Sequence, residues 1–108
     1  MATRTKILVV DSDLDTLSRV YLALVHRNYK VEASDRKEEI SERIKRLKPA
    51  LLILGQNEYL FFEDKLKMPC IILLNLSEDE FHVPEDVIIM RKPIPLDKLI
   101  QKIEEIVY

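Results

Sequence analysis

The 108 residues are enough for one domain with a hydrophobic core and too few for two. With 47% hydrophobic and 33% charged residues, the composition is that of a folded globular chain rather than a disordered one. A formal net charge of −2 gives no electrostatic reason to expect binding of nucleic acid or of an anionic membrane. The abundance of Lys and Glu beside few Gln and Asn is typical of a heat-tolerant source.

Three features of the sequence bear on where the protein works. Its apolar runs reach no more than six residues, far short of a membrane span. The opening MATRTK lacks the apolar stretch of a secretory signal. The single cysteine, Cys70, excludes an internal disulfide, and its apolar neighbours predict a small buried side chain in a reducing compartment. We therefore expect a cytoplasmic domain with no membrane or nucleic-acid partner.

The first third of the chain predicts a strand, a helix and a second strand. ILVV (7–10) is continuously apolar and rich in β-branched residues, which is typical of a strand buried on both faces. Apolar residues at helical spacing then predict a helix that ends at Asn28, a residue type that tolerates left-handed backbone. These apolar residues are Leu14, Leu17, Val20, Tyr21, Leu24 and Val25. YKVEAS (29–34) alternates, as a strand nearer the sheet edge does.

The middle third continues this alternation. Asp35 and Glu38 form a D-x-x-E start signal for a helix that ends before Pro49. One face of this helix carries Ile40, Ile44 and Leu47. ALLIL (50–54) predicts a third buried strand, and Gly55, the only glycine of the chain, follows it. A lone glycine there indicates either a positive φ or the close approach of another group.

The segment EYLFFEDKLK (58–67) predicts about two helical turns. Because a helix turns by about 100° per residue, its consecutive large apolar side chains cannot all point inward. We expect Leu60 and Phe61 to pack inward and Tyr59 or Phe62 to stay partly exposed. An exposed aromatic side chain beside the strand ends is a candidate for contact with a partner protein.

The last third supplies two more strands and a final helix. CIILL (70–74) and VIIM (87–90) predict buried strands, and a short helix that starts at Ser77 is stopped by Pro84. Pro95 opens the final helix. Its inner face carries Leu96, Leu99, Ile100, Ile103, Ile106 and Val107.

Five apolar strands that alternate with helices predict an α/β fold with a parallel sheet covered on both faces. Functional residues of such sheets lie beyond the carboxyl ends of the strands. In this sequence the ends carry Asp11-Ser12-Asp13, Gly55-Gln56-Asn57, Leu74-Asn75 and Arg91-Lys92-Pro93.

Five segments carry a resemblance to a known family: KILVVDSD, NYKVEAS, KPALLIL, MPCIILL and RKPIPLDKLIQKI. In order and over nearly the whole chain, they resemble the receiver domain of bacterial response regulators. The resemblance implies a single domain over residues 1–108 with a doubly wound, flavodoxin-like sheet of order 2-1-3-4-5. It also implies an aspartate at the end of the third strand that accepts a phosphoryl group beside a bound Mg²⁺. The third and fourth helices are expected to be shorter than in the family, because residues 56–69 and 76–86 are short connections.

The resemblance places most of the family's functional positions on residues that cannot perform this chemistry. Gly55 stands at the phosphoacceptor position and has no side chain. Ser12 replaces the second member of an acidic pair that begins with Asp11, so a charge that contacts the metal is lost. Leu74 and Ile89 stand at the positions of the hydroxyl sensor and of the aromatic switch residue.

Asp11 and Lys92 are the two functional residues that the resemblance retains, and we expect them to form an ion pair. Asp11 or Asp13 is expected to organise the loop and to cap the first helix. Asp11, Asp13 and the Asn57 carbonyl could form a residual cation site, but hard cations prefer more carboxylates. We therefore expect Mg²⁺ to bind very weakly or not at all, and we expect no cofactor. Neither histidine has metal-ligand spacing, and both are expected at the surface.

The strands predicted at 70–74 and 87–90 are apolar at nearly every position, although the connection between them is too short for a full covering helix. Phe81 and Val83 could fold over that face. Alternatively, a second copy of the chain or a partner protein closes a surface formed by these strands and the final helix. The candidate interaction residues are Tyr59, Phe62, Phe81 and Arg91.

Two functions remain open. One is a phosphorylation-independent, receiver-like module that has no enzymatic activity and acts through protein–protein contact in a two-component or phosphorelay system. The other is an active receiver that is phosphorylated on a non-standard aspartate, Asp11 or Asp13.

Overall fold

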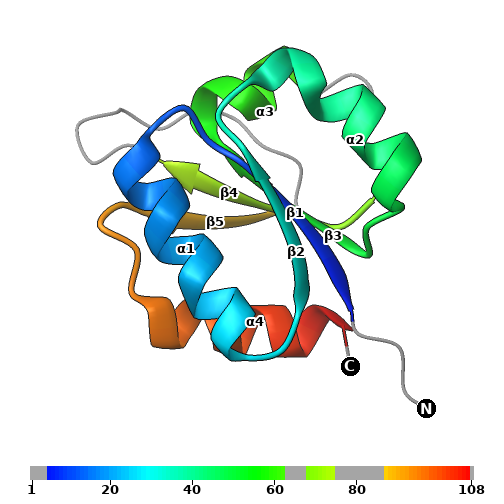
Figure 1. The fold of residues 1–108 in the computed structure, drawn as a ribbon. Coiled ribbons are helices and arrows are strands. Elements are labelled where there is room, and N and C mark those ends of the chain that lie inside the picture. Colours follow the sequence, from blue (N-terminus) through cyan, green and yellow to red (C-terminus); the bar gives the residue numbers. More distant parts are fainter. Residues whose placement is uncertain (1–4, 63–67, 75–86, 108) are drawn as a thin grey trace.

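The computed structural model describes residues 5–62, 68–74 and 87–107. These residues contain five parallel strands, which are β1 (Lys6–Val10), β2 (Lys30–Ser34), β3 (Leu51–Gly55), β4 (Cys70–Leu74) and β5 (Ile88–Arg91). They also contain the helices α1 (Leu14–His26), α2 (Ile40–Leu47), α3 (Gln56–Phe62) and α4 (Leu96–Val107), and a short 3-10 turn over Lys37–Glu39. The strand order is β2-β1-β3-β4-β5, so the predicted doubly wound sheet is confirmed (Figure 1).

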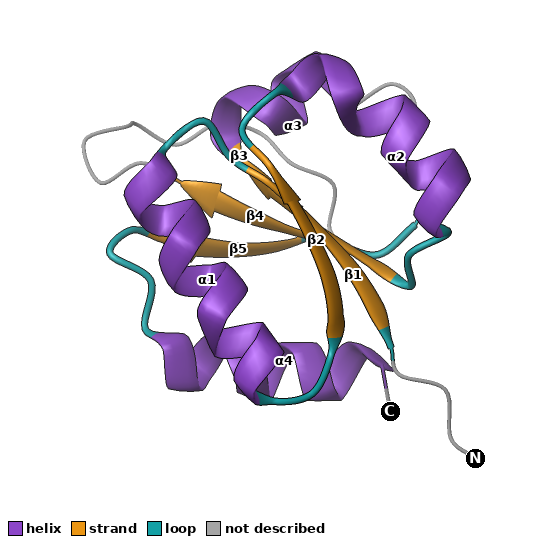
Figure 2. Cartoon of the chain, viewed as in Figure 1, coloured by secondary structure: helices purple, strands orange, loops and turns teal. Residues whose placement is uncertain are grey.

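Helices cover both faces of the sheet, with α1 and α4 on one face and α2 and α3 on the other (Figure 2). Side chains of each strand alternate between the two resulting cores. In β1, Ile7 and Val9 join the core with α1 and α4, whereas Leu8 and Val10 join the core with α2 and α3. Every residue of β3 and β4 is buried, as expected for central strands of a parallel sheet. In the described residues, no helix combines the length and apolarity that a membrane crossing requires.

Two helix ends follow the predicted local signals. Asn28 adopts a left-handed φ of 67° after α1, as its residue type indicated. Helix α2 ends at Leu47, and Lys48 takes a left-handed φ of 54° immediately before Pro49. The chain therefore turns back toward the sheet at both places.

The predicted start signal of the second helix is wrong. No side-chain hydrogen bond caps the 3-10 turn or α2, so the Asp35–Glu38 pair does not act as a capping box. The Ser34 hydroxyl instead accepts a hydrogen bond from the Arg36 amide at 3.1 Å and donates to Glu39 Oε1 at 3.0 Å. Ser34 is the last residue of β2, so its hydroxyl is already fixed where the chain leaves the sheet.

The apolar stripe of α1 is only partly buried. Leu17, Val20 and Leu24 enter the core, whereas Leu14 and Val25 remain 60% and 45% exposed. Tyr21 and Leu22 are exposed as well. Helix α1 lies over β2, the edge strand, so part of its apolar surface faces the open side of the sheet.

The expected phase of the third helix is wrong. Helix α3 starts at Gln56, two residues before the predicted start. Tyr59 and Phe62 are 3% and 6% exposed, whereas Leu60 and Phe61 are 47% and 52% exposed. Because α3 starts immediately after β3, it presents Gln56, Tyr59 and Phe62, three residues apart, to the sheet.

Part of the predicted interaction surface lies outside the described residues. This holds for Phe81 and Val83. His82 and the short helix predicted after Ser77 also lie outside the described residues. In β5, Ile88 and Met90 pack against the core with α1 and α4, while Ile89 is 38% exposed. Closure of the β4–β5 face by a second copy or a partner therefore stays a prediction.

Cys70 lies in β4 and is 2% exposed. Burial raises the pKa of its thiol to about 12, so the thiol is protonated at neutral pH. The predicted role as a small buried side chain is confirmed.

Candidate functional site

The carboxyl ends of β1 and β5 are joined by an ion pair. Lys92 Nζ lies 3.0 Å from Asp11 Oδ2 and 3.3 Å from Asp11 Oδ1. The two side chains are only 11% and 3% exposed. Among the described residues Asp11 Oδ2 has no donor other than the Lys92 ammonium, which therefore compensates its burial. The predicted ion pair is confirmed.

Two aspartates of the loop after β1 have different structural roles. Asp13 is the N-cap of α1, because its side chain accepts hydrogen bonds from the Thr16 amide at 3.3 Å and the Thr16 hydroxyl at 2.8 Å. Asp11 does not cap the helix, but its Oδ1 accepts the Asp13 amide at 2.9 Å and so shapes the loop. Lys92 Nζ also lies 3.3 Å from Asp13 Oδ2, and therefore contacts both carboxylates.

Gly55 is required here by the close approach of other groups. No glycine in the described chain has a positive φ, so backbone conformation does not demand this residue. A Cβ at position 55 would lie 2.7 Å from Asp11 Cγ and 2.8 Å from Asp11 Oδ1, and it would overlap Glu58 Oε1. The space that a side chain at the end of β3 would need is already occupied by two carboxylates.

Glu58 belongs to this candidate site but was not predicted from the sequence. It lies in the first turn of α3 and is only 3% exposed. The Ser12 side chain and backbone both hydrogen-bond to its carboxylate. Because α3 begins directly after Gly55, a residue three positions further on returns over the strand end. In the sequence, Glu58 stands three residues after Gly55. This spacing predicts a position over the strand end only if the helix is known to start at Gln56.

Burial changes the acidity of both carboxylates at the strand ends. Desolvation raises the pKa of Asp11, although the Asp13 amide and Lys92 oppose the shift. Desolvation and the nearby Asp11 charge raise the pKa of Glu58, against the hydrogen bonds from Ser12. Hydrogen bonds from Thr16 lower the pKa of Asp13. Asp11 and Glu58 therefore form a pair of carboxyl groups that disfavours two negative charges.

This pair predicts a stability that declines as the pH rises from acidic to neutral. A carboxyl whose pKa is raised by folding binds more protons in the folded chain, so the free energy of unfolding falls as the pH rises through the folded pKa. Glu58→Gln removes one acid but keeps an acceptor for Ser12. We expect this variant to be more stable than the wild type at neutral pH and to lose less stability between acidic and neutral pH. Urea unfolding at a series of pH values measures both effects.

Glu39→Gln provides a control of opposite sign. Hydrogen bonds from Ser34 and Arg43 lower the pKa of Glu39, so its contribution is present at neutral pH and is lost as the pH falls. Its replacement should lower stability at neutral pH. A Glu58→Gln variant with the pH profile of the wild type would contradict the carboxyl pair.

The other residues predicted at the strand ends differ in their exposure to solvent. Ser12 is exposed, Leu74 is 2% exposed in the core with α2 and α3, and Arg91 is exposed at the end of β5. An open, polar pocket of about 350 Å³ lies beyond the ends of β1, β2 and β3. Its lining residues are Ser12, Asp35, Arg36, Lys37, Glu38, Asn57 and Glu58.

The predicted interaction residues require a correction. Tyr59 and Phe62 are buried and are not available to a partner, because their face of α3 meets the sheet. Leu60 and Phe61 are exposed in their place, and Lys37 Nζ lies 5.2 Å from the centre of the Phe61 ring.

The donor set at the strand ends does not fit Mg²⁺. The carboxylates of Asp11 and Asp13 both contact the Lys92 ammonium, which takes the place that a cation between them would occupy. Asn57 is exposed on α3. The described residues contain no cluster of three or more His, Cys, Asp or Glu side chains suited to a metal ion. Weak or absent Mg²⁺ binding stays a prediction.

Solved structures with the same fold are numerous, although no protein-family model and no curated protein matches this sequence. A response regulator from Chloroflexus aurantiacus is 18% identical, with a TM-score of 0.79 over 96% of this chain and 98% of its own. A response regulator receiver protein from Sinorhizobium medicae is 18% identical, with a TM-score of 0.76 over 95% and 94% of the two chains. NtrX from Brucella abortus is 18% identical, with a TM-score of 0.81 over 97% of this chain and 26% of its own.

These likenesses show that the chain has the fold of response-regulator receiver domains. The expected sheet order and the flavodoxin-like architecture are thereby confirmed. In this fold, the site built from Asp11, Glu58 and Lys92 lies at the carboxyl edge of the sheet, where ligands of doubly wound proteins bind.

Proposed function

We propose that this chain is a receiver-like signalling module that works without phosphoryl transfer and acts through protein–protein contact in a two-component-type regulatory system. The observation that carries the proposal is the end of β3, where Gly55 offers no nucleophile and the Glu58 carboxylate occupies the adjoining space.

Transfer of a phosphoryl group to a carboxylate requires room for an incoming anion and cations that neutralise its oxygens. Here two buried carboxylates, Asp11 and Glu58, already lie side by side at the strand ends. The Lys92 ammonium, whose side chain is 11% exposed, is engaged by Asp11 and Asp13. A further anion at this place would meet like charge, so the pocket supports a fixed state rather than a switch.

The surface that such a fixed module presents includes the exposed outer face of α3. Leu60 and Phe61 stand there beside Lys37, and aromatic side chains are enriched at protein interfaces. We propose these residues, together with Arg91, as contacts for the protein partner. The module has no catalytic residue of its own in this proposal.

Incubation with acetyl phosphate and Mg²⁺, followed by intact-mass measurement, tests the proposal. We expect no phosphoryl adduct, because the described strand ends provide no free carboxylate with a cation of its own. A phosphorylatable receiver domain treated in parallel confirms that the reagent is active.

The same experiment separates the alternative, an active receiver phosphorylated on a non-standard aspartate. An adduct that disappears in Asp13→Asn or in Asp11→Asn would establish that alternative and overturn the proposal. Asp13 is the more accessible of the two, because its side chain is 43% exposed.

A further inference from the structure

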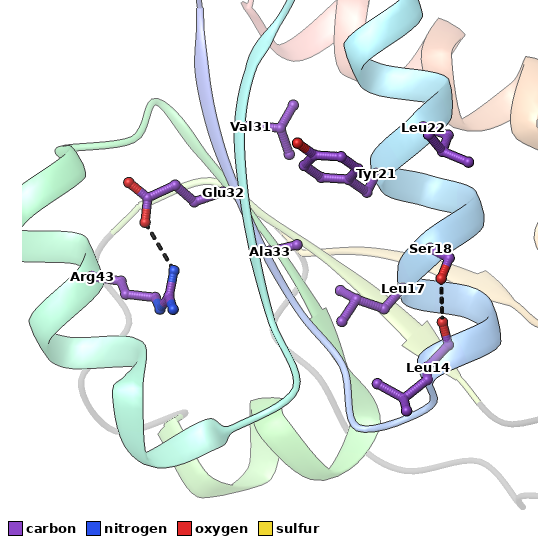
Figure 3. A pocket seen from close by; sticks show the side chains of 9 residues that line it. All are labelled: Leu14, Leu17, Ser18, Tyr21, Leu22, Val31, Glu32, Ala33 and Arg43. Carbon is purple, nitrogen blue, oxygen red and sulfur yellow. Dashed lines mark hydrogen bonds and ion pairs between the residues drawn. The ribbon is translucent and has the colours of Figure 1, made fainter.

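An open groove runs along the β2 edge of the sheet, far in the strand order from β4 and β5. It has a volume of about 630 Å³ and lies between α1 and β2 (Figure 3). Leu14, Leu17, Tyr21 and Leu22 of α1 form one wall, and Val31 and Ala33 of β2 line the strand side. In Figure 3 the Tyr21 ring lies beside Val31, and the Glu32–Arg43 ion pair closes the side toward α2.

The backbone of β2 offers unpaired hydrogen-bonding groups at this edge. The Lys30 amide donates to the Thr5 carbonyl at 2.9 Å, and the Ser34 carbonyl accepts the Asp11 amide at 3.1 Å. Alternate residues of a strand point their backbone groups the same way, so those of Val31 and Ala33 point away from β1. Within the described residues, β2 is an edge strand with no partner on that side. An edge of this kind accepts an additional strand.

The apolar wall of α1 is symmetric about its middle. Leu14 and Leu22 are 60% and 56% exposed, and each lies four residues from Ser18. Ser18 is small, and its hydroxyl is turned back to the Leu14 carbonyl at 2.9 Å. A two-fold axis near Ser18 would therefore bring Leu14 of one copy to Leu22 of the other without a bulky side chain between the helices.

We propose that a second copy of this chain occupies the groove, with the two β2 strands paired antiparallel about a two-fold axis at Glu32. Val31 of each copy then exchanges backbone hydrogen bonds with Ala33 of the other, and the two α1 helices cover the new strand pair on one face. The sequence thus supplies a self-complementary surface, which a two-fold interface requires. This interface is distinct from the β4–β5 surface and does not depend on whether the strand-end pocket accepts a phosphoryl group.

Charge on the other face of β2 suits the same arrangement. The axis places Glu32 opposite its own copy, and like charges at opposed positions destabilise a sheet. Each Glu32 carboxylate, however, contacts Arg43 at 3.0 Å and Arg46 at 2.6 Å. The arginines of both copies therefore surround the two carboxylates and offset their repulsion.

The size of the groove sets the expected strength. Stable interfaces use about 20–30 residues from each partner, whereas only the nine residues around this groove form its lining. We therefore expect a weak dimer that forms between micromolar and millimolar concentrations.

Sedimentation velocity over that range, with hydrogen exchange of backbone amides, tests the proposal. We expect the Val31 and Ala33 amides to become protected as the concentration rises, while the Glu32 amide, which faces β1, is protected throughout. Leu14→Glu should weaken self-association by roughly tenfold or more, because each dimer loses two leucine contacts. The matched control is Leu60→Glu. Leu60 lies on the opposite face of the sheet and is 47% exposed, compared with 60% for Leu14, and its replacement should leave self-association unchanged.

Circular dichroism of both variants establishes that they remain folded. A protein that stays monomeric at millimolar concentration overturns the proposal. So does a dimer that survives Leu14→Glu or that protects β5 amides instead. Binding of an extended apolar peptide by a strictly monomeric chain would assign the groove to another protein and would equally overturn it.

Discussion

Replacing Lys92 with methionine is expected to lower the free energy of unfolding by about 3 kcal/mol at neutral pH. The substitution keeps much of the side-chain volume but removes the ammonium that compensates Asp11. Asp11 is 3% exposed and its Oδ2 has no other described donor, so the remaining charge would be buried without a partner. Chemical unfolding of the wild type and of Lys92→Met at neutral pH measures the difference.

The loss should shrink as the pH falls. Desolvation already raises the pKa of Asp11, and removal of Lys92 raises it further, so the carboxyl of the variant becomes neutral at a higher pH. A neutral Asp11 no longer needs the ammonium. The variant should therefore approach the wild type in stability under acidic conditions.

Lys102→Met is the matched control for this substitution. Lys102 and Glu105 form an ion pair at 3.5 Å on the surface of α4, and their side chains are 48% and 55% exposed. Exposed pairs of this kind contribute about 0–1 kcal/mol. Equal losses for Lys92→Met and Lys102→Met would contradict the structural role of the Asp11–Lys92 pair.

Replacing Gly55 with alanine is expected to lower the free energy of unfolding by about 1–3 kcal/mol. The φ of Gly55 is not positive, so alanine suits the backbone and the cost comes from overlap. Glu58 can move its carboxylate aside. Asp11 is held by the Asp13 amide and Lys92, and its Cγ would lie only 2.7 Å from the new methyl group. Thermal and chemical unfolding of the variant measure the effect.

The double variant Gly55→Ala with Glu58→Ala separates the two neighbours. Truncation of Glu58 opens space beside position 55, so the double variant should recover part of the loss seen with Gly55→Ala alone. A Gly55→Ala protein as stable as the wild type would mean that the strand end has room for a side chain. The inference that Asp11 and Glu58 fill the space beside Gly55 would then be wrong, and the main support for a phosphorylation-independent module would be removed.

The lack of space beside Gly55 also affects how such a module would signal. A switch requires two states of similar free energy that a ligand can bias. At these strand ends, Lys92 pairs with Asp11, and the carboxylates of Asp11 and Glu58 fill the space beside Gly55. A partner that recognises this domain would then read a constant surface, and regulation would lie in the amount of the protein or in the partner.

The sequence alone was sufficient to predict the order of the five strands and of the four α-helices that the structure describes. Strands β1, β3, β4 and β5 coincide with short apolar runs, and β2 coincides with an alternating one. The periodicity of α4 marks its buried face because polar residues separate the apolar ones. The ion pair between Asp11 and Lys92 was expected from the resemblance to receiver domains, and in the structure it joins the carboxyl ends of β1 and β5.

Only the tertiary structure decided which side of α3 is buried and what fills the pocket. Four large apolar residues in succession leave the phase of a helix undetermined, and the sheet selects Tyr59 and Phe62 because α3 leaves β3 without a loop. Until the buried side of α3 is known, nothing in the sequence distinguishes Glu58 from the other glutamates. Its carboxylate then turns toward Asp11, a residue 47 positions away in the chain, and into the space left by Gly55. Local sequence patterns do not predict this contact between Glu58 and Asp11, because it depends on how β1 and β3 are paired in the sheet.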